Sequence, residues 1–202
     1  GIMNGTVDVN VTNQIAREAW ADTVKAAEKF NKPGEFTTFV AYEYTTSSDD
    51  MGNLHRNVIF RGSDKLPAMP FSRFHSQDPE GLWDWMDDMR TEGYESIAIP
   101  HNSNISKGFM FPETTIKGEP VTVDYARLRA KWEPVVEVTQ IKGDSETHPD
   151  LSPEDPFADF ETYGYYIQPK PEKYVATEAD YVRSGLKRGL EFEKKLGVNP
   201  YK

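Results

Sequence analysis

Four stretches of the chain carry the apolar spacing or the end signals of helices. Residues 13–31 form the first, which ends before Lys32-Pro33-Gly34, a combination that stops helices. The second begins with Asp78 as cap and Pro79 in the first helical position, and both residues are favoured there. We therefore expect helices over 13–31, 79–92, 124–131 and 177–196, with Gly197 as the stop of the last one.

Other stretches are rich in β-branched and aromatic residues, which is typical of strands. They cover residues 36–46, 54–61, 96–100 and 134–139. A polar turn, residues 47–53, separates the first two, and we expect them to pair as a hairpin. Residues 143–171 are polar and proline-spaced, which predicts a long irregular excursion.

The order of these elements predicts an α/β fold. Strands separated by helices of this length are typical of a largely parallel sheet or barrel. A length of 202 residues with 37% hydrophobic content is sufficient for one core, so we expect residues 1–202 to form a single domain. In such folds the chemistry lies at the carboxyl ends of the strands, which makes polar residues at strand ends the first candidates for a site.

Composition narrows the classes of partner and site. The formal net charge of -10 repels phosphate backbones and anionic membranes, so bulk nucleic acid is not an expected partner. The longest apolar runs are too short to cross a bilayer and the first residues do not form a signal segment, which predicts a soluble protein of unassigned compartment. The chain has no cysteine, so any metal must be held by His, Asp, Glu or water.

Four residues at or just after the predicted strands have the chemistry of metal ligands: Glu43, His55, His101 and Glu137. A single strand histidine is more often a hydrogen-bonded structural residue than a ligand. A carboxylate among apolar neighbours, in contrast, is costly unless it is paired or binds a cation. As a set, imidazoles and carboxylates suit a divalent ion that keeps one position open for water.

Two further interpretations concern the same residues. Arg56, next to His55, is the candidate clamp for the phosphate or carboxylate group of a small anionic substrate. An alternative to metal chemistry is a glycosidase-like barrel in which Glu43 and Glu137 act as an acid and nucleophile pair.

The sequence around these candidates resembles a known family. Residues 40–45, 53–60, 99–102 and 136–138 are similar, in order and spacing, to motifs of a large family of unknown function of the polymerase and histidinol phosphatase (PHP) kind. The resemblance implies a distorted (β/α)7 barrel that hydrolyses phosphoesters with a metal-bound hydroxide, using zinc, manganese or iron ions. It carries over Glu43, His55, His101 and Glu137 as metal ligands, with Asn102 supporting His101 from outside the ligand set.

The chain departs from the PHP pattern in three motifs. It lacks the His-x-His pair of the first PHP strand, the Asp-His of the second strand and the Asp-x-His motif of a late strand. We interpret the chain as an internal segment of a larger metallohydrolase domain with an incomplete metal site. On its own we expect it to bind metal weakly, to hydrolyse little and to self-associate through exposed sheet edges. The alternative is a non-catalytic binding or scaffold domain with a degraded site.

Overall fold

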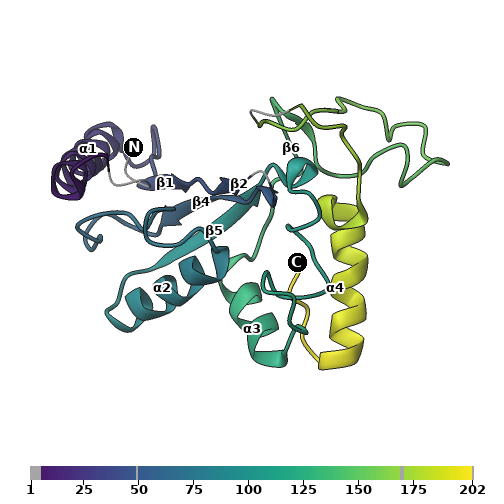
Figure 1. The fold of residues 1–202 in the computed structure, drawn as a ribbon. Coiled ribbons are helices and arrows are strands. Elements are labelled where there is room, and N and C mark those ends of the chain that lie inside the picture. The colour runs from purple at the N-terminus through teal and green to yellow at the C-terminus, as the bar shows by residue number, and fades with distance from the viewer. Residues whose placement is uncertain (1–5, 49, 169–170, 202) are drawn as a thin grey trace. The chain divides into compact units, whose positions relative to one another are not determined.

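The computed structural model describes residues 6–48, 50–168 and 171–201. Helices and strands are both present, as predicted for an α/β protein (Figure 1). They belong to two compact units: unit 1 contains the chain up to Tyr44 together with Val58–Ile97, and unit 2 contains Thr45–Asn57 and the chain from Ala98 onward. That residues 1–202 form one domain, and part of a larger one, stays a prediction.

The main sheet has three strands, with β4 between the other two (Figure 1). The strands are β1 (Ala41–Tyr44), β4 (His55–Phe60) and β5 (Ser96–His101). This arrangement confirms the pairing expected between the runs 36–46 and 54–61, although β1 covers only part of the first run.

Two backbone hydrogen bonds give the direction of β4. Phe60 N donates to Val40 O and Arg61 N donates to Glu95 O, each at 2.9 Å. The end of β4 therefore lies beside the beginnings of β1 and β5, so β4 is antiparallel to both. This corrects the expectation of a largely parallel sheet, because the link from β1 to β4 is too short for the crossover that parallel neighbours need.

Two short antiparallel ladders account for the other strands of the described ranges: β2 (Ser47–Ser48) with β3 (Gly52–Asn53), and β6 (Thr139–Gln140) with β7 (Gly143–Asp144). The turn predicted over 47–53 thus contains a short pair of strands, β2 and β3. The strand predicted over 134–139 is wrong except at its last residue, Thr139, where β6 begins. The described strands form no closed barrel.

The excursion predicted over 143–171 is irregular after β7 in the residues that are described. Residues 169–170, which fall within this prediction, lie outside the described residues. Two of its aromatic side chains, Phe157 and Phe160, are exposed, so they do not anchor the segment to a core.

Four α-helices lie in the described ranges: α1 (Val9–Phe30), α2 (Pro79–Thr91), α3 (Val123–Trp132) and α4 (Val182–Leu196). All four were predicted; α2 begins at Pro79 as expected, and the other three begin at different residues. α1 begins earlier because Asp8 caps it, accepting a hydrogen bond from Asn10 N at 2.8 Å. α4 begins later because the Thr177 hydroxyl bonds to the Asp180 carboxylate at 2.9 Å, which holds a short 3-10 turn, η3 (Glu178–Asp180), before it.

The core of unit 1 is built around aromatic side chains. The Trp20 ring of α1 lies 5.9 Å from the Tyr42 ring and 5.8 Å from the Phe60 ring. Its Nε1 donates to Pro67 O at 2.8 Å, which satisfies the polar edge of the indole. α2 contributes a buried stripe of Leu82, Trp83 and Met86, and burying each such side chain stabilises the fold by roughly 1.5–3 kcal/mol.

The core of unit 2 packs α3 and α4 around the end of the chain. The Phe111 and Tyr201 rings meet edge to face with centroids 5.5 Å apart. A Cβ on Gly185 of α4 would lie 2.7 Å from the Phe111 ring, so this glycine permits the close approach of the helix. The buried cluster contains Leu54, Met110, Phe111, Val121, Ala126, Val182, Phe192 and Tyr201.

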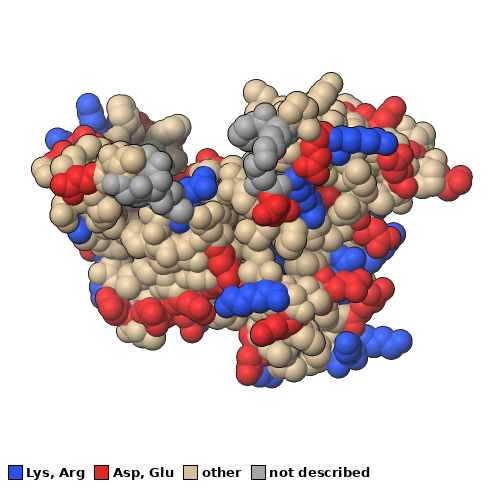
Figure 2. All heavy atoms as spheres, viewed as in Figure 1, with Lys and Arg blue, Asp and Glu red and all other residues tan. Residues whose placement is uncertain are grey.

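Charged side chains are distributed over the surface. On the face drawn in Figure 2, acidic ones gather over α2, which carries Glu80, Asp84, Asp87 and Asp88. In the part of the chain that the structure describes, every helix is too short or too polar to cross a membrane.

Candidate metal site

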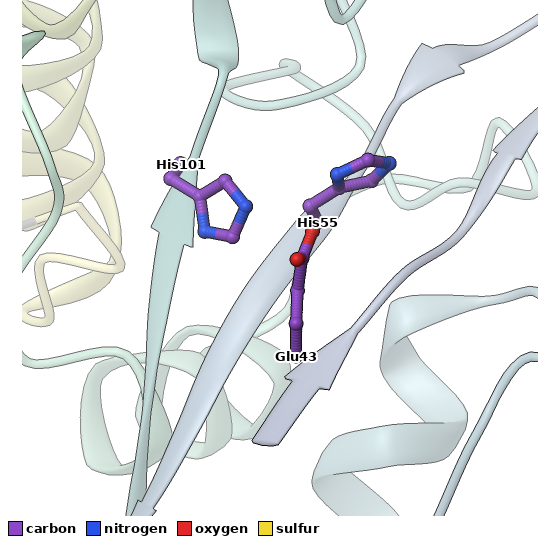
Figure 3. A group of neighbouring side chains, drawn as sticks. All are labelled: Glu43, His55 and His101. Carbon is purple, nitrogen blue, oxygen red and sulfur yellow. The ribbon is translucent and has the colours of Figure 1, made fainter. Parts of the chain in front are cut away.

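Glu43, His55 and His101 come together on three neighbouring strands. They lie near the end of β1, at the start of β4 and at the end of β5, and the antiparallel direction of β4 makes these positions adjacent. One ligand atom of each residue lies within 4.8 Å of those of the other two. Figure 3 shows the Glu43 carboxylate beside His55, with His101 projecting from the next strand. The imidazole centroids are 5.6 Å apart.

Strand alternation explains which way these side chains face. Tyr44, the neighbour of Glu43, is buried, and its hydroxyl donates to Ser76 O at 2.7 Å. Glu43 therefore faces the opposite side and is exposed. His55 and His101 are only 8% and 5% exposed, so two buried imidazoles meet one carboxylate that reaches solvent.

This group could hold a metal ion. Protein ligands lie about 2.0–2.2 Å from zinc, so ligands at tetrahedral positions are about 3.4 Å apart. The separations in the group are within 4.8 Å, a difference that side-chain rotation can close. Two neutral imidazoles and one carboxylate carry one negative charge, so a bound divalent cation would leave the site positive and attractive to anions.

Asn102 turns the chain away from β5 directly after His101. Its backbone is left-handed, with φ 59° and ψ 33°, and leads into η2 (Ser103–Ile105). Its side chain is 1% exposed, and neither the amide nitrogen nor the amide oxygen has a hydrogen-bond partner among the described residues. Such a buried amide costs about 1–3 kcal/mol, so a further polar group would bind favourably here. The predicted support of His101 does not come from a hydrogen bond between the two side chains.

Arg56 takes a different role from the predicted substrate clamp. It is buried, its Nε donates to Glu133 Oε1 at 2.8 Å, and its Nη1 donates to Leu54 O at 2.9 Å. Arg129 approaches the same carboxylate, with Nη2 and Glu133 Oε2 3.2 Å apart. A guanidinium held in a buried ion pair is not available to a substrate, so Arg56 anchors the start of β4 instead.

Glu137, the fourth predicted ligand, lies outside this group. It is half-buried, and its Oε1 accepts a hydrogen bond from Gln140 Nε2 at 2.7 Å. Its backbone N donates to Pro100 O at 3.0 Å, so the segment approaches β5 without forming a strand. The structure therefore brings together three of the four predicted ligands.

Two residues of the buried ion-pair cluster at Arg56 were not predicted from the sequence, Arg129 and Glu133. Their i, i+4 spacing at the end of α3 is the signal that could have indicated a pair. Arg56, however, is 77 residues from Glu133 along the chain. A pattern that is local in sequence cannot predict such a contact.

Comparison with known proteins gives one result. A family model described as "Protein of unknown function (DUF3604)" matches residues 2–202, a range that includes all three residues of the group. Searches of curated proteins and of solved structures found no match.

Proposed function

Because the chain belongs to the DUF3604 family, whose function is unknown, we propose its function from the site: metal-dependent hydrolysis of phosphoesters. The observation that carries the proposal is the group Glu43, His55 and His101. Two histidines and one glutamate are the protein ligands of several catalytic zinc sites, which keep a further position for water or substrate. The same set of donors also suits iron in sites with open positions.

In this proposal the three side chains divide the work between them. His55 and His101 hold the ion from the buried side, where they exclude water, and Glu43 closes the set on the exposed side. When bound, such an ion lowers the pKa of a coordinated water and neutralises charge on a phosphoryl oxygen. The net charge of -10 favours a small substrate with one anionic group over a long polyanion.

We extend the proposal to the PHP superfamily, with zinc, manganese or iron as the metal. Support comes from the resemblance of residues 40–45, 53–60 and 99–102 to PHP motifs, since these runs contain the three residues of the group.

Metal chemistry is preferred over the glycosidase alternative for a chemical reason. A carboxylate-pair mechanism has no use for two imidazoles beside one of its carboxylates, and both His55 and His101 lie beside Glu43. Glu137, the other carboxylate of that mechanism, is hydrogen bonded to Gln140 and lies outside the group. A non-catalytic binding or scaffold domain with a degraded metal site is the remaining alternative.

Zinc titration of matched glutamate variants tests the proposal. Calorimetric titration of metal-free protein should give one site, and Glu43→Gln should weaken its affinity at least roughly tenfold. Glu35→Gln, at an exposed position outside the group, should bind zinc as the wild type does. Equal affinity of the two variants would refute the site.

Turnover separates an enzyme from a scaffold. Hydrolysis of 4-nitrophenyl phosphate should follow the metal content of the protein and disappear on chelation, in the wild type and in Glu35→Gln alike. Stoichiometric metal binding with no hydrolysis by any metal form would favour the scaffold instead.

A further inference from the structure

A groove of about 750 Å³ lies in unit 1 between α1, β1 and residues 69–75. Its size falls within the range of about 300–1,000 Å³ that is usual for small-molecule sites. Glu43 lines this groove and also belongs to the metal group. We propose that the groove binds an aromatic or alkyl group of the substrate, next to the ester group at the metal site. This inference rests on the proposed function.

The walls of the groove are mainly apolar. Trp20 and Tyr42 line it with their rings at 82° to each other, and Met69 and Phe74 add further apolar surface. The indole N–H already donates to Pro67 O, so the rest of the Trp20 ring offers only hydrocarbon surface. A ring or an alkyl chain matches walls of this kind.

The polar side chains that line this groove include Asn13, Glu43 and His75. Ser72 N donates to His75 Nδ1 at 3.0 Å, which leaves Nε2 as the ring nitrogen that can donate to a bound molecule. The ring also stacks on Phe71 with centroids 5.0 Å apart, which fixes its plane. His75 thus offers one hydrogen-bond donor to an oxygen of the bound molecule, in a groove whose lining also includes the Glu43 carboxylate.

The substrate is preferred as occupant because of Glu43. The carboxylate places the metal group at the wall of the groove, so a molecule with one apolar and one anionic part can use both. A partner protein or a second copy of the chain could occupy the groove without any contact with the metal group.

Binding of paired phosphonates tests the inference. Zinc-loaded protein should bind naphthylmethylphosphonate about tenfold more tightly than methylphosphonate, because only the first reaches the groove. Ala16→Phe places a ring in the groove from α1, whose residue 16 lines it, and should abolish this preference. Ala26→Phe, at an exposed position of the same helix outside the groove, is the matched control and should retain it.

A metal-free measurement separates this inference from the proposed function. Metal-free protein should still bind 1-naphthol, detected by tryptophan fluorescence, and Ala16→Phe should not. Naphthol binding together with no phosphonate binding would support the groove and reject the metal site. Equal affinity for both phosphonates in a zinc-binding protein would overturn the groove and leave the metal site standing. A dimer by sedimentation that Ala16→Phe dissociates would also overturn it, since a second copy would then be the occupant.

Discussion

Arg56 Nε lies 2.8 Å from Glu133 Oε1, with the two side chains only 1% and 2% exposed. The carboxylate is shared with Arg129. Burial opposes the charge of Arg129, but the field of Glu133 outweighs it and raises the pKa of Arg129. The pair joins the residue after α3 to the start of β4, next to His55.

Glu133→Gln should therefore destabilise the protein strongly. Removing one partner of a buried ion pair leaves an uncompensated charge, which costs about 3–5 kcal/mol in the free energy of unfolding. Urea unfolding measures this cost. Glu95→Gln is the control, because its partner Arg61 has a side chain that is 80% exposed, and exposed pairs contribute little. Similar midpoints for the two variants would show that the buried pair is not structural.

Zinc should stabilise the folded chain. A ligand that binds only the native state at a hundred times its Kd raises the free energy of unfolding by about 2.7 kcal/mol, so the Tm should rise with zinc and fall back on chelation. His101→Gln should lose this increase while it keeps a cooperative transition without metal. The prediction fails if the Tm of His101→Gln rises with zinc as much as that of the wild type.

Asp180 should make stability fall as pH rises from about 4 to 6. Burial raises its pKa to about 6, against hydrogen bonds from Gly108, Ser106 and Thr177 that lower it. Between the ordinary carboxyl pKa and this value the native state holds a proton that the unfolded state has lost, so stability declines through this window and levels off above it. The stability of the wild type relative to Asp180→Asn should drop by about 2–3 kcal/mol between pH 4 and pH 7.

Asp155 provides the control of opposite sign. A hydrogen bond from Phe157 N and the bond to Arg183 lower its pKa. Its stabilisation is therefore present above the ordinary carboxyl pKa and is lost as pH falls below it. Urea unfolding measures the stability of the wild type relative to each variant. Relative to Asp155→Asn this stability should fall as pH decreases, whereas relative to Asp180→Asn it should fall as pH increases. A change of the same sign for both variants would contradict these assignments.

Gly52→Ala should disturb the turn that carries Asn102. Gly52 has a φ of 61°, and a Cβ there would lie 2.4 Å from Ile105 O in η2. Both the strained φ and the clash with backbone should cost stability, together about 2 kcal/mol or more. Gly118→Ala has a similar φ of 81° with nothing within 4 Å, so thermal unfolding of the two variants separates the clash from the backbone strain.

The helices and β4 could be predicted because their signals are local. Asp78 and Pro79 mark the start of α2, and the β-rich run ending at Phe60 marks β4. The direction of β4 could not be predicted in this way, because helices between strands suggest parallel crossovers. What decides the direction is the ladder of β2 with β3, a connection too short for a crossover.

The candidate site was predictable in residue type and only partly in geometry. Glu43, His55 and His101 were expected at strand ends, yet His55 lies at the first residue of β4. It joins the other two because β4 runs the opposite way. Glu137 was expected on a strand that does not form. Arg56 was expected to clamp an anionic group of the substrate, but Glu133, far along the chain, pairs with it in the core.

Asn102 implies a trade-off between stability and activity. Its left-handed backbone would suit glycine better, and its buried amide has no partner among the described residues, so the fold bears two costs at one position. Asn102→Gly should therefore yield a more stable protein, in spite of the greater chain entropy of glycine. A gain in stability with a loss of metal-dependent hydrolysis would mark Asn102 as a residue that serves function at the expense of the fold.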